Sequence, residues 1–412
     1  MARHSLPLGA RGVARLALAL AALLAAMPAR AQQVAPPSDD LADRARIRVG
    51  PFYFQPGIAL TNAGYDSNVF RDYQEPKEDF TFTLTPALDG GMRAGPARLN
   101  FRLVTDYVWY RTYRGEGGVD GSALLQFELR YNWLRPYVSG EWINTRSRPG
   151  YEIDARAERN LPTYQAGADA RIASRTWVVL SYRHAATRFL AGEIYEDVPL
   201  DQALNNTTRT STAGLRFELS PLTTLSLLTR LEQARFDSAK SRDNESWLFM
   251  PTFDFSPEAL LSGQASIGYR SLTAKTAGMP DFRGVVANVS LKYAPLPSTS
   301  VAFGGSRDIA YSFEEDHPYY LLSGVNASIT QRIIGAFEVI VQGRLEYLDY
   351  REFEGRSAPR QDTVAVYGGG VGYRLGDVAR VGLDVEWSER RSELPDRDYQ
   401  GTRIFGSFRH GF

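Results

Sequence analysis

The 412-residue sequence contains no cysteine, four histidines and five methionines. The absence of cysteine excludes disulfides, zinc–thiolate centres and thiol catalysis, and it suits a protein that enters an oxidising compartment. Beyond residue 31 the sequence has no run of about 18 apolar residues, so a helical membrane protein is not expected. It also lacks a basic excess, because 47 Lys and Arg balance 47 Asp and Glu. This balance argues against a nucleic-acid partner.

The first 31 residues have the three parts of a secretory signal peptide. Basic residues come first, the apolar run 16–27 follows, and Ala29-Arg30-Ala31 forms a small-x-small cleavage site. We therefore predict residues 1–31 to be a signal peptide that is cleaved after Ala31. Cleavage would remove four arginines and no acidic residue, which leaves about four more acidic than basic residues in the mature chain.

Residues 32–50 are polar and include Pro36-Pro37, and they are too few for a folded domain. We expect a short periplasmic leader, either disordered or lying as a strap at the periplasmic mouth. Residues 51–412 are then expected to form a single domain.

Apolar residues in that domain recur at every second position, which is the period of a β-strand. In the segment 122–133, one face is apolar and the other is mostly polar. The apolar face reads Ala123, Leu125, Phe127, Leu129, Tyr131 and Trp133, against Leu124, Gln126, Glu128, Arg130 and Asn132. The segments 99–110, 337–347 and 381–388 alternate in the same way.

The length of these alternating segments favours a membrane barrel over a soluble sandwich. They run for about ten residues or more, as a tilted bilayer-spanning strand requires, whereas strands of soluble sheets average five or six. Several apolar faces end in an aromatic residue, namely Trp109, Trp133, Tyr347 and Trp387. Rings at strand ends are typical of the girdles where hydrocarbon meets lipid headgroups.

Turn signals give the number of strands. Short turn signals recur about every forty residues, and each interval leaves room for two long strands and one longer polar connection. The short turns are expected at 94–96, 134–136, 173–175, 220–222, 256–258, 295–297, 334–335 and 375–377. The longer connections are expected at 66–78, 114–120, 146–158, 190–205, 237–243, 274–281, 313–318, 353–360 and 391–396. Eight turns and nine loops predict an all-β, antiparallel up-and-down transmembrane barrel of eighteen strands, with sixteen as the alternative.

The first expected strand carries a sequence resemblance. Gly64-Tyr65-Asp66-Ser67-Asn68-Val69-Phe70 resembles the start of a group of outer-membrane β-barrel porins that includes the EpsL-like barrels associated with exopolysaccharide genes. The resemblance implies an outer-membrane barrel and a role in polysaccharide export, and it brings no catalytic residue. From the residues alone, Asp66-Ser67-Asn68 is a turn whose side chains bond their own backbone. A calcium or sugar contact at this turn is the less favoured reading.

Charged residues of both signs occupy the expected inward positions. They are Arg102, Asp106, Glu128, Arg130, Arg216, Glu218, Arg230, Glu232, Glu338, Arg344, Glu346, Asp384, Glu386, Arg403 and Arg409. A barrel of this size can enclose a water-filled channel, and a wall of mixed charge suits hydroxyl-rich or zwitterionic solutes. The other interpretation is a network of salt bridges that partly fills the lumen. Both interpretations remain open.

An enzyme is less expected, because the three histidines of the mature chain lie far apart in the sequence. His184 shares a strand with Ser181 and Arg183 but faces the opposite side. His317 directly follows Glu314-Glu315-Asp316 in what we expect to be a solvated charged loop, and His410 lies in the last strand. No metal-ligand spacing appears, and no cofactor is expected.

The segment 404–412 alternates as a strand and ends on Phe412. This resembles the C-terminal strand of outer-membrane barrels, so Phe412 is the expected signal for the barrel-assembly machinery. The expected surroundings are outer-membrane lipid and, if the barrel exports polysaccharide, the polymer or other export-complex proteins. The function hypotheses are therefore a passive outer-membrane channel for carbohydrate or exopolysaccharide, and a non-conducting barrel that acts as a scaffold or surface-interaction protein.

Overall fold

The computed structural model describes residues 45–411 apart from 355–357 and 377. The elements are β1 (Ile47–Val49), β2 (Phe52–Asp66), β3 (Asp79–Ala94), β4 (Ala97–Tyr110), η1 (Arg114–Glu116), β5 (Gly118–Leu129), β6 (Leu134–Thr145), β7 (Arg159–Ala173), β8 (Thr176–Phe189), β9 (Ile194–Tyr195), β10 (Val198–Pro199), α3 (Leu200–Leu204), β11 (Asn206–Ser220), β12 (Thr223–Phe236), η2 (Lys240–Arg242), β13 (Asn244–Phe255), β14 (Leu261–Ala274), β15 (Phe282–Leu296), β16 (Thr299–Tyr311), β17 (Tyr319–Ile334), β18 (Phe337–Arg351), β19 (Gln361–Leu375), β20 (Ala379–Arg391), η3 (Pro395–Arg397) and β21 (Tyr399–His410).

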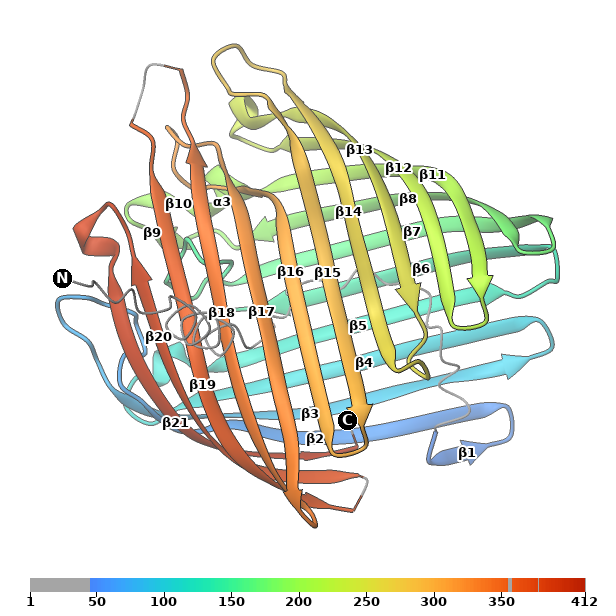
Figure 1. Cartoon of the computed structure of the whole chain (residues 1–412). Coiled ribbons are helices and arrows are strands. Elements are labelled where there is room, and N and C mark those ends of the chain that lie inside the picture. The colour runs from blue at the N-terminus through green and yellow to red at the C-terminus, as the bar shows by residue number, and fades with distance from the viewer. Residues whose placement is uncertain (1–44, 355–357, 377, 412) are drawn as a thin grey trace, which may run out of the picture.

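The long strands form one closed antiparallel barrel. Each strand from β2 to β8 and from β11 to β21 pairs with the next, and β2 pairs with β21 to close the ring. Within the described residues this gives eighteen barrel strands, so the predicted number is confirmed and the alternative of sixteen is wrong. Figure 1 shows the strands tilted around a single wall, with the longer connections gathered at one end.

The barrel strands contain twelve to sixteen residues, which confirms the predicted length. Their two faces alternate as the sequence indicates. On β5, Leu125 and Phe127 are 54% and 39% exposed, whereas Gln126 and Glu128, which alternate with them, are buried. Because apolar side chains point outward and polar ones inward, the wall is inverted relative to a soluble barrel, as contact with lipid requires.

Seven of the eight short turns and the nine longer loops lie where the sequence places them, with small shifts in their bounds. The turn expected at 134–136 is wrong, because these residues begin β6 and the connection lies at 130–133. The connection expected at 114–120 spans 111–117, and the one expected at 391–396 spans 392–398. The loop at 190–205 is less irregular than expected, because β9 pairs with β10 and α3 follows.

The segment 64–70, which resembles the EpsL-like barrels, closes the barrel at its loop end. Asp66 is the last residue of β2, and its carboxylate pairs with Arg403 of β21 at 3.3 Å. The Ser67 hydroxyl accepts a hydrogen bond from the Thr402 N–H at 2.8 Å, and the Asn68 amide donates to the Gln400 carbonyl at 2.9 Å. The Asn68 N–H also donates to the Asp66 carboxylate at 3.0 Å, which is the local turn bond expected from the sequence. The motif therefore ties the first strand to the last.

The predicted signal peptide and Phe412 lie outside the described residues, as does most of the predicted leader. The described end of the leader forms β1, which pairs with β2 through Arg48 opposite Tyr53. Among the residues that the structure describes, no helix is long and apolar enough to cross a membrane.

Candidate functional site

The residues expected to line the lumen lie on seven strands. They are Arg102 and Asp106 on β4, Glu128 on β5 with Arg130 directly after it, Arg216 and Glu218 on β11, Arg230 and Glu232 on β12, Glu338, Arg344 and Glu346 on β18, Asp384 and Glu386 on β20, and Arg403 and Arg409 on β21. Five of them border one cavity of about 1020 Å³ inside the barrel. These five are Arg230, Glu232, Arg344, Glu386 and Arg403.

Many of these charges pair with partners on the same strand, on the next strand or on the second strand along the wall. The pairs are Arg102 with Asp89 (3.5 Å), Arg130 with Glu128 (3.0 Å), Arg216 with Asp169, Glu232 with Arg270 (3.2 Å), Glu338 with Arg380, and Arg403 with Glu386 (3.5 Å). Others bond to neutral groups. Asp106 accepts from Thr85, Glu218 from the Trp177 indole (2.9 Å) and Asp384 from Ser407 (3.3 Å). In the strand ladder Arg230 lies opposite Leu248, and Arg409 lies opposite Arg380.

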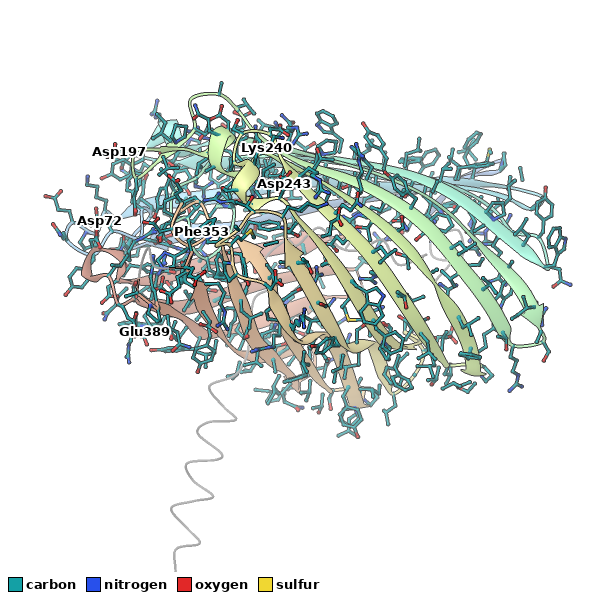
Figure 2. The ribbon with its side chains drawn as sticks, turned by 90° about the horizontal axis from the view of Figure 1, so that it is seen from above. Asp72, Asp197, Lys240, Asp243, Phe353 and Glu389 are labelled. Atoms are coloured by element: carbon teal, nitrogen blue, oxygen red, sulfur yellow. The ribbon has the colours of Figure 1, made fainter. Side chains whose placement is uncertain are left out.

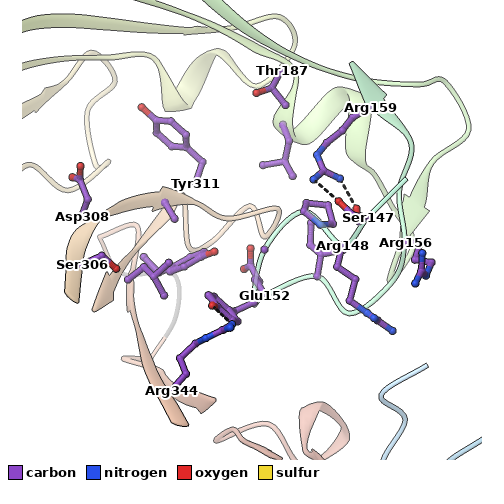
Figure 3. A pocket seen from close by; sticks show the side chains of 18 of the residues that line it. Ser147, Arg148, Glu152, Arg156, Arg159, Thr187, Ser306, Asp308, Tyr311 and Arg344 are labelled. Atoms are coloured by element: carbon purple, nitrogen blue, oxygen red, sulfur yellow. Dashed lines mark hydrogen bonds between the residues drawn. The ribbon is translucent and has the colours of Figure 1, made fainter. Parts of the chain in front are cut away.

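The loop 146–158 crosses the lumen from one wall to the other. It connects β6 and β7, and β18 lies nine strands along the ring from β7, half of an eighteen-strand circle. Arg344 of β18 nevertheless donates to the Tyr151 hydroxyl at 2.7 Å, and that hydroxyl lies 3.1 Å from the Glu346 carboxylate. Figure 3 shows Arg344 reaching toward this loop. Two predicted lumen residues thus hold a loop within the bore.

The loop is also anchored by apolar packing. Ile153 and Ala157 are buried against Phe189 at the end of β8, Leu200 of α3 and Phe313 of the β16–β17 loop. Burial of side chains of this size stabilises by roughly 1.5 to 3 kcal/mol each. Apolar contact therefore keeps the loop inward in addition to its polar bonds.

A buried ionic cluster joins the inward loop to the barrel rim. Arg390 of β20 is 1% exposed and pairs with Asp154 of the loop at 2.8 Å and with Asp362 of β19. Asp362 also accepts from Arg360 at 2.7 Å. Arg360 in turn pairs with Glu314, so that four separate segments share one set of charges. Breaking one partner of such a buried network leaves another charge without compensation.

Two carboxylates of this cluster titrate far from the ordinary value. Burial raises the pKa of Glu152 to about 7, although the Ser312 hydroxyl donates to it at 2.6 Å. Burial alone would raise the pKa of Glu314 as well. The hydrogen bond with His317 and the guanidinium of Arg360 outweigh burial there and lower that pKa to about 2. The loops therefore hold one ionised acid and one that is about half protonated near pH 7.

His317 lies in the cluster rather than in solvent. The expectation of a solvated loop around it is wrong, because its ring is buried between the Glu314 carboxylate (3.0 Å) and the Ala358 carbonyl (3.3 Å). His184 lies on β8, where its ladder partners are Arg209 and Tyr164. His410 contacts Arg46 at 3.3 Å. The three side chains thus lie in separate parts of the molecule.

Sequence reasoning missed the residues that fill the lumen from above, chiefly Tyr151, Glu152 and Asp154. Nothing in the loop sequence separates an inward polar loop from a solvated one. Arg270 and Asp308, which form a 3.0 Å pair on the wall, could have been found, because strand parity places them on the inward face. Figure 2 shows Asp72, Asp197, Lys240, Asp243 and Phe353 gathered at the loop end of the barrel. Among the described residues, no group of three or more His, Asp or Glu could hold a metal ion.

Several solved structures are similar to this chain in fold. OpdK from Pseudomonas aeruginosa is 10% identical, with 86% of this chain and 98% of that chain covered and a TM-score of 0.47. OccK2 (OpdF) from Pseudomonas aeruginosa, solved in complex with glucuronate, is 11% identical, with 87% and 98% covered and a TM-score of 0.49. The FrpB iron transporter from Neisseria meningitidis is 11% identical with a TM-score of 0.44; 86% of this chain is covered, and the chain spans 64% of that protein.

Comparison with curated protein sequences gives no match. The family described as "Putative beta-barrel porin 2" matches residues 146–410, which is more than half of the chain. That match begins at the inward loop and continues to the last residue of β21. The chain therefore belongs to this family of porins, not to an enzyme family, and its eighteen-strand barrel is a barrel of the outer membrane.

Proposed function

We propose that the barrel is a passive channel for short, hydroxyl-rich solutes such as small sugars. The observation that carries this proposal is the chemistry of the lumen cavity. Besides its charged residues, the cavity is bordered by amide, hydroxyl and phenol groups. They include Asn62, Asn288, Thr81, Ser266, Ser306, Tyr110, Tyr311 and Tyr399. Such a wall offers donors and acceptors in many directions, and tyrosine rings present flat faces for sugar rings.

The size of the cavity favours short solutes over a polymer. About 1020 Å³ is at the upper end for small-molecule sites, whose own volumes are roughly 300 to 1,000 Å³. The inward loop occupies the route above the cavity through its contacts with β18. A polysaccharide chain would need that loop to leave the lumen.

Exopolysaccharide export is the second candidate, and it rests on the resemblance of the segment 64–70 to EpsL-like barrels. In that role the polymer and export-complex proteins would be the partners, and the loop 146–158 would act as a displaceable barrier. Block of the ion current by added polymer separates the two candidates. A sugar channel should let short sugars pass through the open pore. An exporter should be blocked by its polymer only when the loop 146–158 has left the lumen.

Conductance of the purified, folded barrel in planar bilayers tests the channel. We expect stable ion current, and we expect liposomes containing the protein to swell in mono- and disaccharides but not in long dextrans. Heat-modifiable migration in detergent gels would establish that the sample is folded. Folded protein that neither conducts nor permits swelling would overturn the proposal and support the non-conducting scaffold.

A further inference from the structure

Two cavities meet at three arginines. The second cavity, of about 480 Å³, lies among the loops and is bordered by residues of 70–75, 148–156, 195–196 and 396–397 together with Glu116. Among the residues bordering these two cavities, only Arg71, Arg148 and Arg156 border both. We name these three side chains the arginine neck, because a solute moving between the outer pocket and the lumen would pass them.

Neutral groups position most of the neck. The Arg148 guanidinium donates to the carbonyls of Asp154 and Val69, the latter at 2.6 Å. Arg156 donates to the Tyr110 hydroxyl, and its guanidinium lies 4.9 Å from the centre of that ring. Among the described residues, neither guanidinium forms an ion pair with a carboxylate. Their positive charge is held in place without being neutralised.

Arg71 has the single carboxylate contact of the neck within the described chain. It lies 3.4 Å from Asp154 and rests over the Tyr399 ring at 5.1 Å. The same Asp154 carboxylate also pairs with the buried Arg390 at 2.8 Å. One negative charge is therefore shared between two guanidiniums, and the neck as a whole carries an excess of positive charge.

The lowered pKa of Arg148 agrees with the excess of positive charge at the neck. Its burial and the neighbouring charges of Arg71 and Arg156 lower its pKa to about 10. Mutual repulsion of this kind is what an incoming anion would relieve. Guanidinium groups also present paired N–H donors that match the two oxygens of a carboxylate or a phosphate.

We propose that the arginine neck is a binding station for an oxyanion-bearing solute, such as a sugar carboxylate, on its way between the outer pocket and the lumen. This rests on the proposed channel function and adds the charge of the solute. The positive excess lies at the neck itself, because apart from these three side chains five arginines and five carboxylates border the lumen cavity. An oxyanion should therefore bind at the neck rather than throughout the lumen.

The outer pocket has the opposite balance. Six carboxylates and four arginines border it, and Glu196 there is already paired with Arg397 at 3.0 Å. At physiological ionic strength, exposed charges are screened within about 8 Å. The acidic rim therefore has a smaller effect on anion entry than the neck has. The rim lowers anion entry at a distance, whereas the neck raises it by direct contact with the solute.

Reversal potentials under a KCl gradient test the neck at low salt. We expect the wild type to favour chloride and the double variant Arg148→Gln, Arg156→Gln to lose that preference. Coulomb's law in water at about 8 Å predicts roughly a twofold change for each ion, in opposite directions for chloride and potassium, so the chloride-to-potassium permeability ratio should drop about fivefold for each charge removed. The matched control is Arg391→Gln, which removes the same charge from a side chain that is 77% exposed at the end of β20. Arg148→Lys, Arg156→Lys keeps the charge and should keep the preference.

Calorimetry on the detergent-folded protein gives an independent readout, with galacturonate as the probe and galactose as its neutral counterpart. We expect galacturonate to bind the wild type, and the double Gln variant to bind at least about tenfold more weakly, since a hydrogen bond to a charged group contributes about 1.5 kcal/mol or more. A conducting double variant with unchanged selectivity would overturn the neck. A wild type without current would overturn the channel function, and galacturonate binding would then decide the neck alone.

Discussion

The Tyr151 hydroxyl lies between the Arg344 guanidinium at 2.7 Å and the Glu346 carboxylate at 3.1 Å, although about 193 residues separate the loop from that wall. Arg344 and Glu346 are two residues apart on β18, so both side chains point into the lumen. One phenol thus fixes the far end of a loop whose two stems are on the opposite wall. The constriction of this barrel depends on that contact together with the apolar packing of Ile153.

Replacing Tyr151 by phenylalanine removes the hydroxyl and retains the ring. A hydrogen bond to a charged group contributes about 1.5 kcal/mol, so loop opening should become roughly tenfold more frequent. Single-channel recordings should show more frequent steps to a higher conductance. Tyr164→Phe is the control, because Tyr164 is 56% exposed on the outside of β7. Equal records for the two variants would mean that Tyr151 does not hold the loop.

The acid–base state of Glu152 predicts a pH-dependent constriction. Its pKa in the packed loop is about 7, against an ordinary 4.5, so the packed state binds the proton more tightly. The contribution of Glu152 to the stability of the packed loop therefore falls as the pH rises from about 4.5 to 7 and is constant outside that window. We expect higher conductance at pH 8 than at pH 5. In Glu152→Gln, which mimics the protonated acid, this step should disappear.

His317 contributes in the same direction. The hydrogen bond with Glu314 raises its pKa above the ordinary 6.5, so its stabilising charge is complete below 6.5 and is lost as the pH rises through the raised value. A pH dependence that remains in Glu152→Gln should therefore vanish in the double variant Glu152→Gln, His317→Asn. A wild-type conductance that is constant from pH 5 to 8, or one that falls, would contradict both assignments.

The wall of the barrel could be predicted from the sequence, because lipid contact imposes a period of two on each strand. Leu125 and Phe127 are exposed and Gln126 is buried for that reason alone. The loop positions carry no comparable period. Glu152 and His317 look solvated in sequence, yet both are buried, since their partners Ser312 and Ala358 come from other loops. Contacts between loops depend on the closed ring, which no local pattern encodes.

The buried carboxylate Asp362 should be essential for the packing of the loop end. It is fully buried and accepts bonds from Arg360, Arg390 and Ser392. Asp362→Asn leaves Arg390 undercompensated, which typically costs about 3 to 5 kcal/mol. We expect faster proteolysis of the loops while the barrel itself remains heat-modifiable.

Asp349→Asn provides the matched control for Asp362→Asn. Asp349 pairs with Arg351 at 2.6 Å, but both side chains are more than 40% exposed, and exposed pairs contribute at most about 1 kcal/mol. The two variants should therefore differ clearly in loop proteolysis. Indistinguishable cleavage rates would show that the ionic cluster does not stabilise the loops.

The seam between the first and last strands has little room at Gly64. A Cβ atom there would lie 2.0 Å from the Ile404 carbonyl oxygen, which is too close without movement of β21. The ladder is already irregular at this point, since the register of β2 shifts between Leu60 and Ala63. Overpacking typically costs about 1 to 3 kcal/mol, so Gly64→Ala should lower the fraction of barrel that refolds into detergent micelles and its urea midpoint.

Gly121→Ala is the matched control for the seam. Gly121 lies in β5, and the nearest atom to its added Cβ, the Val104 carbonyl oxygen, is 4.0 Å away. This variant should refold like the wild type. If the Gly64→Ala barrel refolds as efficiently as the Gly121→Ala barrel, then β2 and β21 can separate locally without loss of stability. The bonds of Ser67 and Asn68 to β21 would in that case be sufficient to hold the ring shut.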